Sequence, residues 1–171
     1  MTPSFESSYR EIPLTRSKVA LVSLSDHANL SLTKWRFGHN GYAVRSVRKP
    51  KRTEISMHRQ ILGLGAGNPL QVDHINHNKL DNRRENLRIV TCSQNHMNSR
   101  RKNSSVSGYK GVYWSNDERR SKRWIAVIGI GNNKNKHLGR FSTAEEAHKA
   151  YCAAAHKFHG EFAFTDSPLL S

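Results

Sequence analysis

The sequence has little cysteine, no long apolar run and few acidic side chains. Its two cysteines, Cys92 and Cys152, form no Cys-x-x-Cys pair, which excludes a zinc knuckle built from thiolates. We interpret both as small buried residues in a reducing compartment. No run approaches the roughly 18 apolar residues of a membrane span, and the first 20 residues lack a charged start followed by an apolar stretch. We therefore expect an intracellular protein without a membrane partner.

Acidic residues are scarce relative to basic ones. The 171 residues include 28 Lys and Arg against 13 Asp and Glu, which gives a formal net charge of +15. This excess predicts a polyanionic partner. A hydrophobic content of 36% fits soluble globular units rather than a membrane protein or a fully disordered chain. The length allows one or two small domains.

Short apolar segments separated by turn signals predict a strand-rich platform over residues 1–54. Strand-like pieces lie between residues 11 and 22, and Asp26 is placed to cap a brief helix. Asn40-Gly41 suits a tight hairpin turn with positive φ, and a second turn is predicted at 49–52.

The second half of the chain shows a linker and then another folded unit. The stretch 99–107 is polar and basic and cannot bury enough surface to offset its ordering entropy, so we interpret it as a linker. Alternating residues predict strands at 112–114, 124–130 and 136–141. The apolar period then changes to 3.6, which predicts a helix over 143–159.

Between these regions lies a hairpin and helix with polar residues in a particular order. Residues 71–74 and 87–90 predict two strands joined by a long polar loop. The capping box Thr91-x-x-Gln94 then starts a helix and fixes Asn95 about one turn into it. Such a helix can lie across the hairpin, which would bring Asn95 to the Asp73-His74 pair.

This segment closely resembles the HNH endonucleases of phages and mobile introns, and the resemblance is carried by VDHINHNKLDNRRENLRIVTCSQNHMN. It covers roughly residues 55–98 and implies a ββα-metal unit of the His-Me finger type. It also implies that Asp73 and Asn95 hold one divalent cation, that His74 is the general base, and that Asn86 holds the loop and orients His74. Many relatives have histidine where this chain has Asn95, which argues for one Mg²⁺ or Mn²⁺ per site over zinc or nickel.

The residue types suit phosphodiester hydrolysis. Neutral imidazole takes a proton from water near pH 7, and a divalent ion held by Asp and Asn oxygens keeps most of its octahedral shell for phosphate oxygens and water. We expect a 5′-phosphate and a 3′-hydroxyl as products. Because the chain has one such unit, a monomer on double-stranded DNA is expected to nick one strand unless it pairs or turns around.

Some polar residues of this unit have alternative interpretations. Taken singly, an Asp-His pair is usually a hydrogen-bonded turn, and only the combined spacing favours catalysis. His58 and Arg59 fit contact with DNA and structural packing equally well. Asn82 and Arg83 are expected to brace the loop.

Residues 107–165 resemble the ethylene-response-factor (Apetala) type of DNA-binding domain, known from plant transcription factors and also found fused to phage HNH nucleases. The motifs are YKGVYW at 109–114, RWIAVI at 123–128, KHLGRF at 136–141 and TAEEAHKAY at 143–151. In that family a three-stranded sheet enters the major groove and its helix packs behind.

Charge supports a DNA-facing sheet independently. The stretch 98–141 contains eleven Lys and Arg against only Asp117 and Glu118, which suits phosphate contacts with one or two arginines at guanine edges. Tyr113 stands where plant members commonly have arginine, so their target preference does not transfer. At least one tryptophan is expected in the core. The predicted DNA contacts are Arg45, Arg48, Arg59, Lys110, Tyr113, Trp114, Arg123, Trp124, Lys136 and Arg140.

Together these features predict a three-part α+β chain, with the platform at 1–54, the nuclease unit at 55–98, the linker at 99–107 and the DNA-binding domain at 108–166. The leading function is a homing-type DNA endonuclease in the cytoplasm of a phage-infected bacterium. The alternative is a sequence-specific DNA-binding regulator that uses the HNH unit as a scaffold. The intact HNH residue set argues against it, because a decayed site should lose some members. An RNA-binding protein is a third reading that rests on charge alone.

Overall fold

The computed structural model describes residues 8–48, 52–99, 106–131 and 134–165. The chain divides into two compact units, residues 1–92 and 93–171, and each is described by itself. Most of the turn predicted at 49–52 and most of the linker predicted at 99–107 lie outside the described residues. The predicted division of the chain into three parts and a linker therefore stays a prediction.

The first unit begins with a hairpin and a short helix. Strands β1 (Tyr9–Pro13) and β2 (Val19–Ser23) pair antiparallel, and helix α1 (Leu24–Ser31) follows at once. Ser23 occupies the N-cap position, so α1 starts two residues before Asp26, which lies in the first turn instead. The helix predicted near Asp26 is present, but its start was placed too late.

A second small sheet comes from β3 (Arg36–Phe37), β4 (Ala43–Val47) and β5 (Thr53–Ser56), with α2 (Met57–Ile61) after it. The predicted turn at Asn40-Gly41 is confirmed. Gly41 has a φ of +82°, and the amide of Gly38 donates to the carbonyl of Tyr42 at 2.8 Å.

The predicted nuclease hairpin is also confirmed in its strands. β6 (Gln71–His74) and β8 (Leu87–Val90) pair antiparallel, with Asp73 opposite Arg88 and His74 opposite Leu87. The loop between them contains β7 (Asp81–Asn82) and a single 3₁₀ turn, η1 (Arg84–Asn86). β7 pairs in parallel with β2 of the first hairpin. This pairing makes the loop part of the N-terminal sheet. The sequence did not predict it.

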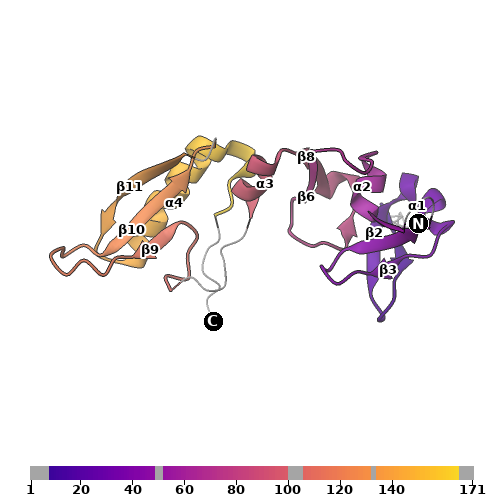
Figure 1. Cartoon of the computed structure of the whole chain (residues 1–171), viewed down its shortest axis with the longest axis horizontal. Helices are drawn as coiled ribbons and strands as arrows, with labels where there is room; N and C mark the ends of the chain where they lie inside the picture. Colours follow the sequence, from indigo (N-terminus) through magenta and orange to yellow (C-terminus); the bar gives the residue numbers. More distant parts are fainter. Residues whose placement is uncertain (1–7, 49–51, 100–105, 132–133, 166–171) are drawn as a thin grey trace, which may run out of the picture. The chain divides into compact units, whose positions relative to one another are not determined.

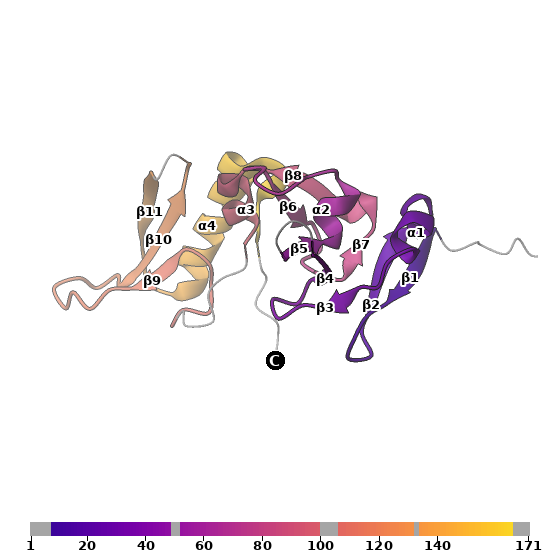
Figure 2. The ribbon, with the colours of Figure 1, turned by 45° about the vertical axis from the view of Figure 1, so that its right-hand side comes forward.

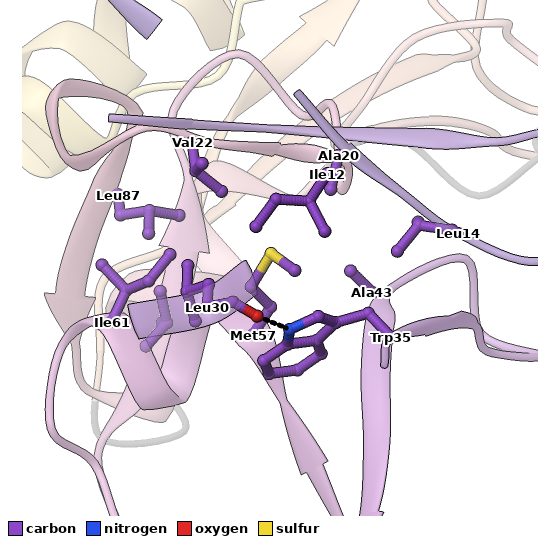
Figure 3. Packing of buried hydrophobic residues seen from close by; sticks show 11 residues of the cluster. Ile12, Leu14, Ala20, Val22, Leu30, Trp35, Ala43, Met57, Ile61 and Leu87 are labelled. Atoms are coloured by element: carbon purple, nitrogen blue, oxygen red, sulfur yellow. Dashed lines mark hydrogen bonds between the residues drawn. The ribbon is translucent and has the colours of Figure 1, made fainter. Parts of the chain in front are cut away.

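One hydrophobic core joins all of these pieces (Figure 3). Met57 is fully buried at its centre, and the indole Nε1 of Trp35 donates to the carbonyl of Leu30 at 2.9 Å. Ile12 and Val22 enter this core from the first hairpin, and Leu87 enters it from β8. The platform and the nuclease hairpin therefore fold around shared apolar side chains.

The second unit matches the predicted elements closely. Helix α3 (Cys92–Asn98) starts directly after Thr91, the residue predicted to cap it, and crosses the boundary between the units. Strands β9 (Val112–Trp114), β10 (Trp124–Gly129) and β11 (Asn135–Phe141) form an antiparallel sheet. Helix α4 (Ala144–His159) lies against one face of that sheet, and η2 (Gly160–Phe162) ends it (Figures 1 and 2).

Several small sheets with short helices make this a mixed α+β protein. Among the described residues, no helix has the length and apolar character needed to cross a membrane.

Candidate active site and nucleic-acid interface

The Asp73-His74 pair ends strand β6 and is buried. Asp73 is 6% exposed and His74 is 4% exposed. Arg88, opposite Asp73 on β8, places its Nε and Nη2 at 2.9 and 2.8 Å from Asp73 Oδ2. This cross-strand ion pair holds the carboxylate at the end of the hairpin, where its charge is partly balanced.

Two aromatic rings surround the imidazole of His74. The ring centroids of His58 and Tyr42 lie 5.1 and 5.8 Å from that of His74, and the two histidine rings meet edge to face. Tyr42 lies 4.8 Å from His58, and Lys79 Nζ lies 4.6 Å from the Tyr42 ring. Tyr42 comes just after the Asn-Gly turn, and His58 lies on α2.

Burial determines the protonation of both histidines. It lowers the pKa of His74, and the neighbouring Asn82 side chain and the Asp73 carboxylate partly oppose that shift. It also lowers the pKa of His58 from 6.5 to about 3, assisted by the nearby His74 and Arg59. Burial, followed by the charge of Asp73, raises the pKa of the Tyr42 hydroxyl. His74 is therefore a neutral imidazole near pH 7, the form that accepts a proton.

Asn86 fastens the loop that follows His74. Its Nδ2 donates to the carbonyl of Asp81 at 2.8 Å and to Asn76 Oδ1 at 2.9 Å, and its Oδ1 accepts from the amide of Asn76 at 2.9 Å. Its backbone carbonyl accepts from the amide of Ile75 at 2.9 Å. The side chain thus ties the residues just after His74 to β7, which is an arrangement suited to the loop-holding role predicted for it.

The loop also contains a second carboxylate. Asp81 is 2% exposed and accepts hydrogen bonds from Arg83 Nε at 2.8 Å, Arg83 Nη2 at 2.7 Å and Asn76 Nδ2 at 2.7 Å. The Arg83 bonds are the main cause of the lowered pKa of Asp81. Arg83 thus braces the loop as predicted. Asn82 is fully buried. Among the described residues, neither its side-chain amide nor His74 Nε2 has a hydrogen-bond partner of normal geometry. The Asn82 amide still lies close enough to His74 to favour the charged form of the imidazole.

The two predicted metal ligands have oxygen donors that suit a hard divalent cation. Asp73 belongs to the first unit and Asn95, on α3, to the second. Their joint role as ligands stays a prediction. Within the described ranges, no three His, Cys, Asp or Glu side chains group to hold a metal ion, and the predicted pair contains only one residue of these types.

Sequence reasoning missed three residues around His74, namely Tyr42, Asp81 and Arg88. Arg88 had a usable signal, because the predicted strands place it opposite Asp73 with complementary charge. Tyr42 and Asp81 come from segments that alternation does not connect to the hairpin, so their position depends on the tertiary fold.

The basic residues predicted to contact DNA from the first unit differ in their surroundings. Arg48 is exposed at the end of the described part of that segment. Arg45 donates to Gln60 Oε1 at 2.8 Å. Arg59 donates to the carbonyls of Leu70, Gly65 and Asn68 at 2.9 to 3.3 Å, which agrees with a packing role, and its contact with DNA stays a prediction.

The sheet of the second unit has two distinct faces. Ala126 and Ile128 on β10 are fully buried against α4. Because successive side chains of a strand point to opposite sides, Ile125 and Val127 lie on the face turned away from α4, which we call the outer face.

The predicted DNA contacts of this sheet divide between these faces. Tyr113 and Arg140 both pair with Ile125, so they lie on the outer face, where Tyr113 is 59% exposed. Trp114 pairs with Trp124, on the same side as Ala126.

Three predicted contacts lie on the helix side, namely Trp114, Trp124 and Lys136, which pairs with the buried Ile128. The rings of Trp114 and Trp124 meet at 4.9 Å, and Arg123 Cζ lies 5.8 Å from the Trp114 ring. Trp124 also packs against the core beneath α4, which confirms that at least one tryptophan is structural. Lys136 Nζ lies 5.1 Å from the ring of Phe158 on α4.

Lys110 has an environment that the sequence did not predict. Its Nζ donates to the carbonyls of His96, Met97 and Ser99 at 3.3, 2.5 and 2.7 Å. These carbonyls are at the C-terminal end of α3, so the ammonium group stabilises that end of the helix.

Comparison with known proteins identifies the family of the chain. A family model described as HNH endonuclease matches residues 64–97. An uncharacterised HNH endonuclease of Acanthamoeba polyphaga mimivirus is 31% identical over 144 residues, which cover 84% of this chain and 72% of the relative. The chain therefore belongs to the HNH endonuclease family.

Partial matches involve plant proteins. An AP2-like ethylene-responsive transcription factor of Arabidopsis thaliana is 37% identical over 84 residues, and one of Oryza sativa subsp. japonica is 39% identical over 87 residues. Each match covers 48% of this chain but only 15% and 13% of the plant proteins. No solved structure matches the chain significantly.

Proposed function

We propose that the protein is a metal-dependent DNA endonuclease of the homing type, in which the second unit directs the nuclease to its target. The observation that carries the proposal is a buried, neutral His74 beside Asp73, in a loop fastened by Asn86. Membership of the HNH family and the ordered hairpin support it. We place its action inside a phage-infected bacterium, on double-stranded DNA and as a monomer.

In the proposed reaction His74 takes a proton from the attacking water, and its lowered pKa keeps the ring ready to accept one at neutral pH. Asn86 keeps the loop after His74 in place, and Arg88 holds the Asp73 carboxylate. A ββα-metal arrangement would let Asp73 and Asn95 hold Mg²⁺ or Mn²⁺, which would stabilise charge on the phosphate and the leaving 3′ oxygen. The products would carry a 5′-phosphate and a 3′-hydroxyl.

For targeting, we propose that the second unit is an ethylene-response-factor type DNA-binding domain. The three strands with α4 behind them agree with the arrangement that the resemblance implies. The outer face offers Tyr113 and Arg140 beside the apolar Ile125 and Val127. Arginine suits guanine edges and phosphates, and apolar side chains suit the thymine methyl group.

A plasmid-nicking assay tests the catalytic proposal. His74→Ala should reduce Mg²⁺-dependent nicking by a factor of about 100 or more, while leaving DNA affinity nearly unchanged. His156→Ala, at an exposed position of α4, is the matched control and should nick normally. Near wild-type nicking by the His74 variant would remove His74 as the base. Binding without any nicking by the wild-type protein in Mg²⁺ would instead favour the non-catalytic regulator.

A further inference from the structure

Helix α3 has only seven residues, which is too short for a helix to be stable by itself in water. The last turn of any helix leaves backbone carbonyls without intrahelical partners. In α3 those of His96 and Met97 accept from the Lys110 ammonium, together with that of Ser99 just beyond the helix. The carbonyl of His96 also accepts from the amide and Oγ of Ser99, at 3.2 and 2.7 Å. The Lys110 ammonium is therefore the group from outside this segment that joins these three carbonyls at the end of the helix that carries Asn95.

The backbone at Lys110 is firmly held on the C-terminal sheet. The carbonyl of the next residue, Gly111, accepts from the amide of Val127 on β10 at 2.8 Å. Gly111 also passes so close to α4 that a Cβ there would lie 2.3 Å from the ring of Tyr151. Just before it, Ser107 Oγ donates to the carbonyl of Val112 at 2.8 Å. Lys110 thus extends to α3 from a rigid part of the sheet and helix.

We propose that Lys110 is a positioning residue that attaches α3, and with it Asn95, to the C-terminal sheet of the second unit. Lys110 then acts through α3 rather than by contacting DNA, although the YKGVYW motif that contains it resembles a DNA-facing segment of the ethylene-response-factor family. The part of the inference that concerns cleavage rests on the proposed function, because it requires Asn95 to be a metal ligand. The part that concerns α3 does not.

The test is amide hydrogen exchange on full-length protein without metal or DNA. Lys110→Met keeps the apolar length of the side chain and removes its three donors. We expect amides of α3 to exchange at least about tenfold faster in this variant, whereas amides of α4 keep their wild-type rates. Lys110→Arg should restore most of the protection, because it keeps the charge and the donors. Lys149→Met, at an exposed position of α4, should change nothing.

DNA affinity and nicking are then measured on the same variants. Lys110→Met should keep its affinity for a double-stranded oligonucleotide within about threefold and lose nicking about tenfold or more. Unchanged exchange in α3 would overturn the proposal, as would faster exchange in α3 and α4 alike. A tenfold loss of affinity with unchanged exchange would make Lys110 a DNA contact. Absence of nicking by the wild-type protein would overturn the proposed function but not the exchange result.

Discussion

At the scale of single residues, the candidate site depends on polar groups removed from water. His58 and His74 lie with their rings 5.1 Å apart and are both buried. A buried imidazole resists protonation because the charged form loses its hydration. Their neutral state is thus a property of the folded chain, and it links the stability of the first unit to pH.

The first residue-scale prediction concerns acid stability. The pKa of His58 falls from 6.5 to about 3 on folding, so between these values only the unfolded chain binds the proton. The free energy of unfolding should therefore decrease as the pH is lowered from 6.5 towards 3, with a contribution from His58 of up to about 1.4 kcal/mol per pH unit. His58→Gln should show a shallower decrease in urea unfolding between pH 7 and pH 4. Equal slopes for the variant and the wild type would contradict this, and His156→Gln should keep the wild-type slope.

The second residue-scale prediction concerns the stability lost when the Asn86 side chain is removed. Asn86→Ala leaves the amide of Asn76 and the carbonyl of Asp81 without their partner, and unsatisfied buried groups cost about 1 to 3 kcal/mol each. We expect a loss of about 3 kcal/mol in the free energy of unfolding, measured with urea, together with weak nicking. Asn29→Ala, at an exposed position of α1, should cost less than about 0.5 kcal/mol. A similarly small cost at Asn86 would show that the loop is held by other contacts.

At the scale of elements, local sequence determines most of the strands and helices but not all of their partners. The strands 71–74 and 87–90 were predicted with the bounds that the structure has, because alternation and a capping signal specify them locally. β7 has two residues in a polar loop, so it shows no period. Its partner β2 lies 60 residues earlier in the chain, because Leu21 pairs with Asp81 and Val22 with Asn82. Such a pairing depends on the shared core.

The faces of the C-terminal sheet could have been assigned from the sequence alone. Alternation along Val112-Tyr113-Trp114 already puts Tyr113 on one side and Trp114 on the other. The family resemblance included both residues among the DNA contacts, whereas the structure places them on opposite faces of the sheet. Lys110 could not have been assigned in this way, because its partners lie on another element.

An element-scale prediction compares two glycines with similar backbone angles. Gly108 and Gly111 have φ of +73° and +70°, but only a Cβ at Gly111 would collide with the Tyr151 ring, at 2.3 Å. Gly108→Ala should cost about 1 to 2 kcal/mol from its backbone angle alone. Gly111→Ala should cost at least about 2 kcal/mol more, because β9 would be pushed away from α4. Urea unfolding followed by tryptophan fluorescence measures both, and equal costs would contradict the close approach.

At the scale of the whole molecule, the net charge of +15 determines how the protein should respond to salt. Each phosphate neutralised by Lys or Arg releases counterions, so the logarithm of the DNA association constant should fall with the logarithm of salt concentration. For six phosphate contacts the expected slope is about −5.

Fluorescence anisotropy from 50 to 200 mM salt measures this slope for a double-stranded oligonucleotide. Arg140→Ala, on the outer face, should make the slope shallower by about 0.9. Lys149→Ala, on α4, should leave it unchanged. A slope near zero in the wild-type protein would contradict an electrostatic interface.

The parallel pairing of β2 with β7 has a consequence for engineering hybrid nucleases. Leu21 and Val22 pair with Asp81 and Asn82. A recombination junction between Val22 and Asp81 would therefore combine the first hairpin of one parent with the catalytic loop of another, and these two segments would not have evolved to pair. The platform and the nuclease hairpin, which share one hydrophobic core, should therefore be exchanged together. To change the DNA target of such a hybrid, we would take residues 8–92 from a single parent and place the junction after residue 92.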